Sequence, residues 1–370
     1  MFNNRIHFYQ NIQGEKMSKP TEKTPRLSFE ESLQKKIVST ENCAGCAACV
    51  VVCPVGCLHY SEEKPKIVNK CTACGICAQI CPRYDFSLST LEKFVFSRER
   101  KPEDNFGIYR RIEIAQARDK NILQVCQDGG AVTTLLKYAL ENGYVDGAVV
   151  SGVSEDRPFF PVPKLVTTPQ EVLKCAGTRY FYSPNLIAFQ EGIKQKKESL
   201  AYVGTPCQIN ALRKIEMFPL KKYANPLRLT IGLMCTESFT YEGLMVRHIQ
   251  KELGIDPRDI SKMNIKGKIL VTTKKGEINA ISLKDAKKYT RKGCASCIDF
   301  SAELADISAG GLGLSGWTFV IIRTEKGEEI FQSAERKGML KTKPVEEERR
   351  AYDLLIKLSN RKRRVSTVSD

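Results

Sequence analysis

Two groups of cysteines repeat one spacing within a short stretch of the chain. Residues 43–54 read C-A-G-C-A-A-C-V-V-V-C-P, and residues 71–82 read C-T-A-C-G-I-C-A-Q-I-C-P. Each group is C-x2-C-x2-C-x3-C-P, in which three thiolates bind three irons of one 4Fe–4S cubane and the cysteine before proline binds the other cluster. The spacing therefore predicts a first set, Cys43, Cys46, Cys49 and Cys81, and a second set, Cys71, Cys74, Cys77 and Cys53.

Zinc sites and disulfides are the alternatives for these eight cysteines. Zinc sites usually pair two C-x2-C units rather than grouping four cysteines so closely. Disulfide frameworks belong to small secreted domains, whereas the first residues of this chain lack the apolar core of a secretory signal. Two ferredoxin-type clusters therefore remain the preferred interpretation, and Cys57, outside the repeat, is expected to be a small buried residue rather than a spare ligand.

Length and composition describe a globular protein of two or three domains. The chain has 370 residues, of which 42% are hydrophobic and 27% charged, and 15 are cysteines. No apolar run is long enough to cross a membrane. Because so many cysteines without a secretory signal suggest metal ligation in a reducing compartment, we expect a cytoplasmic protein, either free or docked on the cytoplasmic face of a membrane.

The net charge of +16 requires a partner or another physical reason. Residues 41–90 are neutral overall, so the excess lies elsewhere, including a C-terminal basic cluster, Arg361, Lys362, Arg363 and Arg364. Nucleic acid, an anionic membrane face and acidic substrates or proteins all attract such charge. A nucleic-acid protein is disfavoured because the basic residues are not interleaved with aromatic ones.

A second group of cysteines lies in the remainder of the chain. Cys207 stands in G-T-P-C-Q at an expected helix start, Cys235 follows an apolar strand, and Cys294 and Cys297 form C-A-S-C. Four cysteines suffice for a third cubane, and equally for a zinc site. Their spacing alone does not decide between these sites and unrelated buried cysteines.

Two glycine-rich stretches are candidates for contact with a cofactor. Residues 127–130, Q-D-G-G, precede an expected helix, and residues 305–313, A-D-I-S-A-G-G-L-G, are expected to form a flexible turn before a strand. Neither has the G-x-G-x-x-G pattern between a strand and a helix, so a Rossmann dinucleotide site is not expected. By themselves such glycine pairs are more often turns.

The elements that must position these residues alternate between strand and helix. After a helix at 28–38, short strands near 60 and 67–68 and a linker at 94–107, we expect strands at 112–117, 147–153, 200–203 and 227–234. Helices are expected at 129–142, 184–193, 206–216, 241–253 and 345–358. Hairpins are expected from 263–273 with 277–283, and from 317–323 with 329–331.

Several motifs occur in the order of a known family. They are Q-D-G-G-A-V-T (127–133), A-G-T-R-Y (176–180), V-G-T-P-C-Q (203–208), G-L-M-C-T-E-S-F (232–239), G-C-A-S-C-I-D-F (293–300) and A-D-I-S-A-G (305–310). Over residues 107–345 the chain resembles the family of coenzyme F420 hydrogenase/dehydrogenase β-subunits. With the cysteine-rich module in front, its layout is similar to the electron-input subunits of archaeal F420 dehydrogenase complexes, which also act as ferredoxin:F420 oxidoreductases.

The resemblance implies cofactors and contacts that spacing alone leaves open. It implies FAD and one 4Fe–4S cluster in this domain, with Cys207, Cys235, Cys294 and Cys297 (the third set) as ligands, while Cys126 and Cys175 remain structural. The implied flavin or F420 contacts are Gln127, Asp128, Gly129, Gly130, Thr178, Arg179, Tyr180, Gly310 and Gly311. The family often has Lys at the position of Arg179, and the two cations differ in geometry.

The implied activity is redox chemistry that belongs to the cofactors. Coenzyme F420 exchanges a hydride, a cluster carries one electron, and a flavin connects the two kinds of transfer. The expected partners are coenzyme F420 and either a ferredoxin or a membrane-bound respiratory complex, docked by the C-terminal basic cluster. The alternatives are a ferredoxin-dependent reductase with another substrate, a fused sulfite reductase, which is disfavoured because no reductase module is added, and a flavin-free electron wire.

The expected fold class is α+β, a bacterial-type two-cluster ferredoxin module fused to a mixed α/β flavin-binding domain. The expected divisions are an N-terminal extension at 1–40, the ferredoxin module at 41–90, the β-subunit domain at 107–345, and a C-terminal helix with a basic tail at 346–370. The extension is expected to be flexible.

Overall fold

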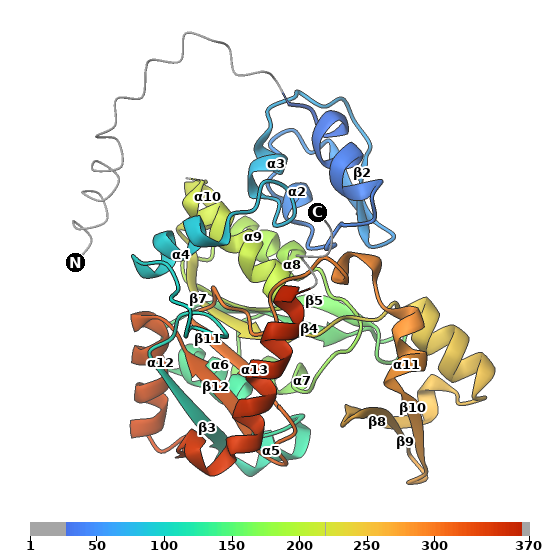
Figure 1. Ribbon diagram of the computed structural model, residues 1–370, viewed down its shortest axis with the longest axis vertical. Helices are drawn as coiled ribbons and strands as arrows, with labels where there is room; N and C mark the ends of the chain where they lie inside the picture. Colours follow the sequence, from blue (N-terminus) through green and yellow to red (C-terminus); the bar gives the residue numbers. More distant parts are fainter. Residues whose placement is uncertain (1–26, 219, 365–370) are drawn as a thin grey trace.

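A computed structural model describes residues 27–218 and 220–364, which form three regions (Figure 1). The cysteine-rich module lies at one end of the molecule. Below it in Figure 1 lies a body built on an eight-stranded sheet, and a three-stranded sheet projects from the side of that body. The first 26 residues, and with them most of the predicted extension, lie outside the described residues, as do residues 365–370.

The module is built from short elements that wrap around its cysteines. Its strands β1 (Leu58–Ser61) and β2 (Lys64–Ile67) confirm the short strands predicted near 60 and 67, and they pair antiparallel. Its helices are η1 (Glu30–Val38), α2 (Ala48–Val51), α3 (Ile76–Ile80) and α4 (Leu88–Phe96). Phe29, Leu33 and Ile37 form a small core with Cys49 and Cys77, so the predicted helix at 28–38 is confirmed and covers the cysteine loops.

The body sheet has a parallel centre and antiparallel edges. Its strand order is β13-β3-β12-β11-β7-β6-β4-β5, and β11, β7, β6 and β4 run parallel. The bounds are β3 (Arg111–Ala117), β4 (Gly147–Val153), β5 (Pro161–Val166), β6 (Leu200–Gly204), β7 (Leu227–Leu233), β11 (Ile307–Gly310), β12 (Thr318–Ile322) and β13 (Leu340–Lys343). Parallel strands place their carboxyl ends at one edge, where α/β proteins bind their ligands.

Both faces of the sheet are covered, which explains why its central strands are nearly continuous apolar runs. On one face Ala201 and Val203 of β6 pack beneath α6 (Ala131–Glu141) and α12 (Glu325–Arg336). On the other, Leu200 and Tyr202 pack beneath α8 (Leu186–Lys194), α9 (Pro206–Met217) and the cysteine module. Helix α13 (Arg349–Arg364) continues that second cover over β3 and β12.

The small sheet has its own core. Strands β8 (Ile260–Ile265), β9 (Lys268–Thr273) and β10 (Ile278–Ser282) form an antiparallel meander against helix η2 (Tyr241–Glu252). The predicted strand at 263–273 is wrong as one element, because the chain turns at Gly267, whose φ is +68°. The hairpin around residues 274–276 is confirmed.

The predicted hairpin from 317–323 with 329–331 is wrong, because its second arm is helical. The chain leaves β12 and enters α12, whose N-cap Thr324 accepts a hydrogen bond from the Gly327 backbone. Ile330, Phe331 and Ala334 are the buried residues that follow, a helical rather than an alternating spacing. Gly327 had suggested a turn, yet an added Cβ there would lie 2.3 Å from the carbonyl oxygen of Asp306.

The predicted flexible turn at 305–313 is also wrong in its first half. Residues 307–310 are β11, a buried strand between β7 and β12 in the middle of the sheet. Small residues are needed here, because an added Cβ on Gly310 would lie 2.6 Å from the Met234 sulfur. Burial between two neighbouring strands therefore outweighs the turn preference of Ser and Gly.

The predicted linker at 94–107 is packed rather than free. Helix α4 extends to Phe96, and Phe106 is fully buried. The last predicted helix is confirmed but longer, since η6 (Val345–Glu348) and α13 extend it to Arg364. The sequence prediction missed α5 (Lys120–Val125), α7 (Pro169–Lys174), β5 and β13. No helix in residues 27–218 and 220–364 has the length and apolar character of a membrane span.

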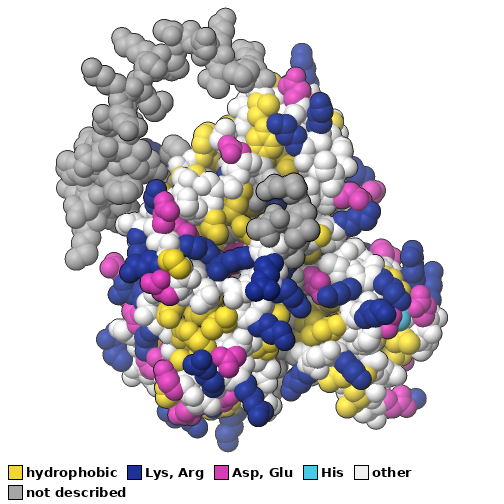
Figure 2. All heavy atoms as spheres, in the orientation of Figure 1, with side chains coloured by type: hydrophobic (Ala, Val, Ile, Leu, Met, Phe, Trp, Pro, Cys, Tyr) yellow, Lys and Arg dark blue, Asp and Glu magenta, His cyan; other side chains and the backbone are white. Residues whose placement is uncertain are grey.

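The remaining elements are short. They are α10 (Lys221–Ala224), η3 (Pro257–Asp259), α11 (Leu283–Ala286), η4 (Lys287–Tyr289) and η5 (Lys292–Cys294). On the face of the molecule seen in Figure 2, lysine and arginine side chains are dispersed over the body and the small sheet with acidic side chains among them.

Candidate functional site

The third cysteine set is assembled at the carboxyl edge of the parallel strands. Cys207 follows β6 at the start of α9, and Cys235 follows the neighbouring strand β7. The Cys235 amide donates to the carbonyl of Phe300 over 2.8 Å, which brings the C-A-S-C loop onto the same edge. Burial raises the pKa of Cys235, and the nearby thiols of Cys294, Cys207 and Cys297 raise it further.

The first and second sets are also brought together as the spacing predicts. Burial raises the pKa of Cys46, and Cys81 and Cys43 of the same set add to the effect. Burial likewise raises the pKa of Cys77 to about 12, with contributions from Cys74, Cys71 and Cys53. Each cysteine that precedes a proline, Cys53 or Cys81, thus lies with the three cysteines of the other repeat. A two-cluster module requires this arrangement of ligands.

The loops of the two repeats have backbone conformations suited to holding sulfur. The amide of Gly45 donates to the Cys43 sulfur, and the amide of Ala73 donates to the Cys71 sulfur, both over 3.4 Å. Ala47 and Ala73 are left-handed, with φ of 65° and 54°. An alanine in that conformation costs about 1–2 kcal/mol. Loops that accept this strain and turn amides toward thiolates fit a 4Fe–4S cluster.

Among the described residues, no three His, Cys, Asp or Glu side chains converge as ligands of one metal ion would. Each cysteine of a cubane binds a different iron, so a cluster does not require such convergence. Cys57 is buried, as predicted, with its sulfur 3.4 Å from that of Cys53. It also lines the cavity formed by Cys53, Cys71 and Cys74.

The three sets lie in a row. The thiol of Cys207 lies near enough to Cys46 to raise its pKa, after the larger effects of burial and Cys81. An added Cβ on Gly293 would lie 2.2 Å from the Cys43 carbonyl oxygen, so the two loops touch through their backbones. Cys49 and Cys77 share the module core, and Cys74 at the far end is exposed.

Two arginines cross the boundary between the module and the body in opposite directions. Arg83 of the module donates to the carbonyls of Ser296 (2.9 Å) and Gly293 (3.1 Å). Arg291 of the body donates to the Ala44 carbonyl (2.7 Å) and pairs with Glu63 (2.6 Å).

Arg291 also connects this boundary to the third set. Its guanidinium stacks on the Tyr182 ring at 4.2 Å, and the Tyr182 hydroxyl lies 3.5 Å from the Cys207 sulfur.

A buried lysine holds the last loop of the first set. Lys214 lies two turns after Cys207 on α9, so one helix serves both sets. Its ammonium group donates to the carbonyls of Cys81 (3.0 Å), Tyr84 (2.8 Å) and Asp85 (3.0 Å). Three acceptors match the three donors of a charged ammonium.

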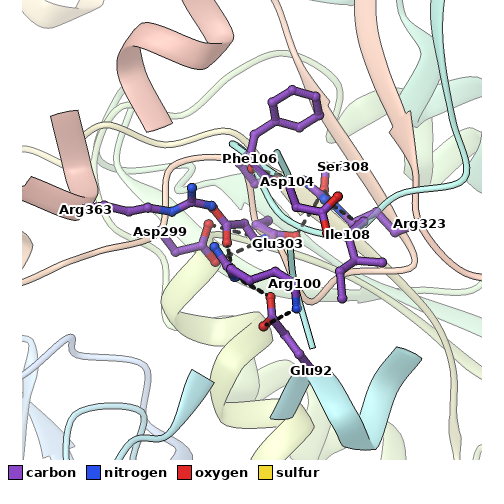
Figure 3. A network of polar contacts seen from close by, with 12 residues as sticks. Glu92, Arg100, Asp104, Phe106, Ile108, Asp299, Glu303, Ser308, Arg323 and Arg363 are labelled. Carbon is purple, nitrogen blue, oxygen red and sulfur yellow. Dashed lines mark hydrogen bonds and ion pairs between the residues drawn. The ribbon is translucent and has the colours of Figure 1, made fainter. Parts of the chain in front are cut away.

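A buried ionic network holds the segment that follows the C-A-S-C loop (Figure 3). Glu303 pairs with Arg100, and with Arg363 over 2.7 Å, while Arg100 also donates to Glu92 over 2.7 Å. Glu92 lies on α4, Arg100 on the segment after it, and Arg363 on α13. The network therefore joins the module helix α4 and the last helix of the chain to the loop that follows Cys297.

Asp299 and Arg323 complete this network. The Glu303 amide donates to Asp299 over 3.1 Å, and burial raises the pKa of Asp299 to about 7. Arg323 is fully buried and donates to Ile108, Phe106 and Ser308 (Figure 3). Burial lowers the pKa of Arg323 to about 10.

The predicted C-terminal basic cluster is not simply a docking surface. Lys362 is buried, and its ammonium group lies 3.4 Å from the Cys294 carbonyl oxygen. Arg363 pairs with Glu303 inside the network. Neutralising residues 361–364 together would therefore disturb the third set as well as any docking.

The residues predicted to contact flavin or F420 come from three loops that the structure brings together. An added Cβ on Gly311 would lie 2.4 Å from an Asp128 carboxylate oxygen, so the two glycine-rich stretches touch. Gln127 donates to Asn264 of β8. Burial raises the pKa of Tyr180 to about 12, while the backbone at Ile265 of β8 counteracts it.

The glycines themselves have structural explanations. An added Cβ on Gly129 would lie 2.4 Å from the Ala115 carbonyl oxygen, and one on Gly130 would lie 2.6 Å from Ile122. Gly310 is likewise required by Met234. These contacts account for the glycines without a cofactor, and their flavin role stays a prediction.

Arg179 is the member of this group whose hydrogen-bonding capacity is incompletely used. Its Nη2 donates to the Ala176 carbonyl over 3.1 Å, but its Nε is buried without a partner. Burial lowers the pKa of Arg179, and it forms no ion pair within the part of the chain described. Burial raises the pKa of Asp128, and Lys266 and Lys262 of the small-sheet region lie close enough to counteract that rise. Thr178, next to Arg179, is exposed.

Sequence reasoning missed the residues that surround the cysteines. Arg83 could have been noticed, since it directly follows Cys81 and Pro82 of the repeat. Lys214, Arg291 and the small-sheet lysines carry no motif, because only the fold brings them to these sites. Cys126 and Cys175 lie apart from the three sets; Cys126 packs with Ala117 and Ile122.

Together these features define an iron–sulfur protein of mixed α/β fold with a dicluster module at its N-terminal side. Residues 25–86 match the 4Fe-4S dicluster domain family. Residues 113–190 and 197–348 match the N-terminal and C-terminal parts of the coenzyme F420 hydrogenase/dehydrogenase beta subunit. The chain belongs to the family of coenzyme F420 hydrogenase/dehydrogenase beta subunits.

Relatives cover either the body alone or the body with the module. The coenzyme F420 hydrogenase subunit beta of Methanococcus voltae is 40% identical over 70% of this chain and 92% of its own length. A subunit of the F420H2 dehydrogenase of Methanosarcina mazei is 31% identical over 80% and 83%, respectively. The coenzyme F420-dependent sulfite reductase of Methanocaldococcus jannaschii is 36% identical over 84% of this chain and 49% of its own.

A solved structure confirms the fold of the body. A chain of the F420-reducing NiFe hydrogenase complex from Methanosarcina barkeri superposes with a TM-score of 0.69 and 36% identity. It covers 73% of this chain, and 93% of that chain is matched.

Proposed function

We propose that this protein is an F420-dependent oxidoreductase that exchanges electrons between coenzyme F420 and a protein partner through FAD and three 4Fe–4S clusters. The observation that carries the proposal is the row of three cysteine sets, which begins at the carboxyl edge of the body sheet and ends at the exposed Cys74. Family membership supports coenzyme F420 as the substrate, and the proposed flavin rests on the resemblance described in the sequence analysis. When bound, FAD would connect hydride transfer with one-electron transfer.

The chain's own residues fit this use in position and charge. The loops containing Asp128, Arg179 and Tyr180 meet beside the small sheet. The unpartnered Nε of Arg179, together with Lys262 and Lys266, suits the phosphates of FAD or F420. Gln127, Gly129, Gly130, Thr178, Gly310 and Gly311 belong to the same loops.

The order of the cysteine sets gives the order of electron transfer. The third set lies in the body, the first set touches it, and the second set includes the exposed Cys74. Electrons from the flavin site would therefore pass through the third, first and second sets in turn. The partner, either a ferredoxin or a component of a respiratory complex, would meet the second set, and the flow reverses when the partner is the donor.

Cofactor analysis and activity together test the proposal. Anaerobically purified protein should contain about twelve irons, from three cubanes, and one FAD, and should reduce a viologen dye with reduced F420. Cys235→Ala should retain about eight irons. Iron without flavin would support an electron wire instead, and flavin without F420-dependent dye reduction would support a reductase with another substrate.

A further inference from the structure

The boundary between the first and third sets contains positive charge that protein carboxylates do not balance. Arg291 is paired with Glu63 at 2.6 Å. Arg83 crosses the same boundary, yet its hydrogen bonds to oxygen go to neutral backbone carbonyls, at Ser296 and Gly293. No ion pair to Arg83 occurs among residues 27–218 and 220–364. Its Nε is buried and has no hydrogen-bond partner there.

Arg83 is held close to cysteines of both the first and the third set. It lies two residues after Cys81, a first-set cysteine, and its acceptors flank or lie between Cys294 and Cys297 of the third set. Lys214 also holds the Cys81 carbonyl, and its hydrogen bonds likewise go to backbone carbonyls. A charge removed from water needs a compensating charge nearby. Thiolate-bound clusters, which carry negative charge, would supply it on both sides.

We propose that Arg83 tunes the clusters of the first and third sets: its charge, held between them, stabilises their reduced forms and raises their reduction potentials. The proposal rests on the ligand sets proposed above. Each transfer moves one electron from one cluster to the other, so one is oxidised as the other is reduced, and no bond or proton changes. Arg83 is a positioning residue and ligates no iron. Charge and hydrogen bonds near the sulfurs are among the factors that set such potentials.

Three variants separate charge from geometry. Arg83→Gln removes the charge but retains hydrogen-bond donors, Arg83→Lys retains the charge, and Arg258→Gln removes one charge from the surface, where Arg258 pairs with Asp256. Each full-length holoprotein is titrated with dithionite while its cluster signals are followed by electron paramagnetic resonance, and its iron is counted. Neither measurement requires coenzyme F420.

For Arg83→Gln we expect unchanged iron and two clusters that are harder to reduce. At a given potential their ratio of reduced to oxidised cluster should fall about tenfold, which is about 59 mV for one electron. The remaining cluster, and all clusters in Arg83→Lys and Arg258→Gln, should titrate as in the wild type. Loss of iron in Arg83→Gln but not in Arg83→Lys would also support a requirement for charge.

Other results would overturn the proposal. They are wild-type potentials in Arg83→Gln, equal shifts of potential in Arg83→Gln and Arg83→Lys, or loss of iron in both variants. Each of these results would mean that Arg83 does not act on the clusters through its charge. A wild-type protein with about eight irons and two cluster signals would instead reject the third ligand set, whichever potentials the variants show.

Discussion

The first and second cysteine sets come from two repeats of the same spacing but have different surroundings. The first set packs against the body, where Cys46, Cys49 and Cys81 are buried and Arg83, Arg291 and Lys214 hold its loops. The second set includes the exposed Cys74 and the partly exposed Cys53 and Cys71. In the proposed electron path the first set is therefore the internal relay and the second set the outlet, because their surroundings differ.

Loss of the outer cluster should have the largest effect. Cys74→Ala removes an exposed ligand, so reduction of a protein acceptor by reduced F420 should fall about 100-fold or more. Reduction of a small dye should remain, because the body site is unchanged. Steady-state assays with both acceptors measure this, and equal loss of the two activities would contradict an outlet at the second set.

Chelation should distinguish the two clusters of the module. Limited oxidation with ferricyanide and EDTA should remove the second-set cluster before the first, because Cys74 is exposed while Cys46 and Cys49 are buried. Iron content and resonance signals sampled over time would show a first phase of about four irons. Simultaneous loss of both clusters would mean that their surroundings do not protect them differently.

Arg291 should contribute more to the free energy of unfolding than Lys292, the next residue in the sequence. Arg291→Ala breaks buried, charge-assisted bonds to Ala44 and Glu63, so unfolding free energy should fall by about 3 kcal/mol. Lys292→Ala removes an exposed pair with Glu41, which should cost at most about 0.5 kcal/mol. Denaturant unfolding of the two holoproteins tests this, and equal effects would show that the boundary is not held by Arg291.

The smallest effect is expected at the surface beside the outlet. Val68 is 56% exposed and close in sequence to Cys71. Val68→Ser should slow reduction of a protein acceptor about threefold, the scale of a peripheral contact. Ile278→Ser on the small sheet, where Ile278 is 65% exposed, is the matched control and should have no effect. A greater effect of Ile278→Ser would mean that the protein acceptor docks at the small sheet rather than beside the second set.

The sequence pointed to the cysteine sets but not to the residues that hold their loops in place. Spacing identified the first and second sets because covalent ligation imposes short, regular intervals. The third set required four distant residues to meet at a sheet edge, and only resemblance to a family selected it. Strong apolar runs such as β6 and β7 were predicted correctly.

Errors arose where tertiary contacts decide the backbone. Gly327 and Gly310 suggested turns, yet both are glycines because Asp306 and Met234 lie against them. The buried network in Figure 3 joins Arg100, Glu303 and Arg363, which lie on distant segments of the chain. No local sequence pattern predicts a network of that kind. The flavin and F420 contacts stay predictions, because the glycines proposed for them already have structural reasons.

The central claim, that the first set relays electrons from the third set to the second, is tested most directly in Cys46→Ala. The protein is mixed anaerobically with reduced F420, frozen during the first turnover, and examined by electron paramagnetic resonance. The account predicts that the third-set cluster is reduced while the second-set cluster stays oxidised, whereas both are reduced in the wild type. Reduction of the second-set cluster at the wild-type rate in Cys46→Ala would contradict it.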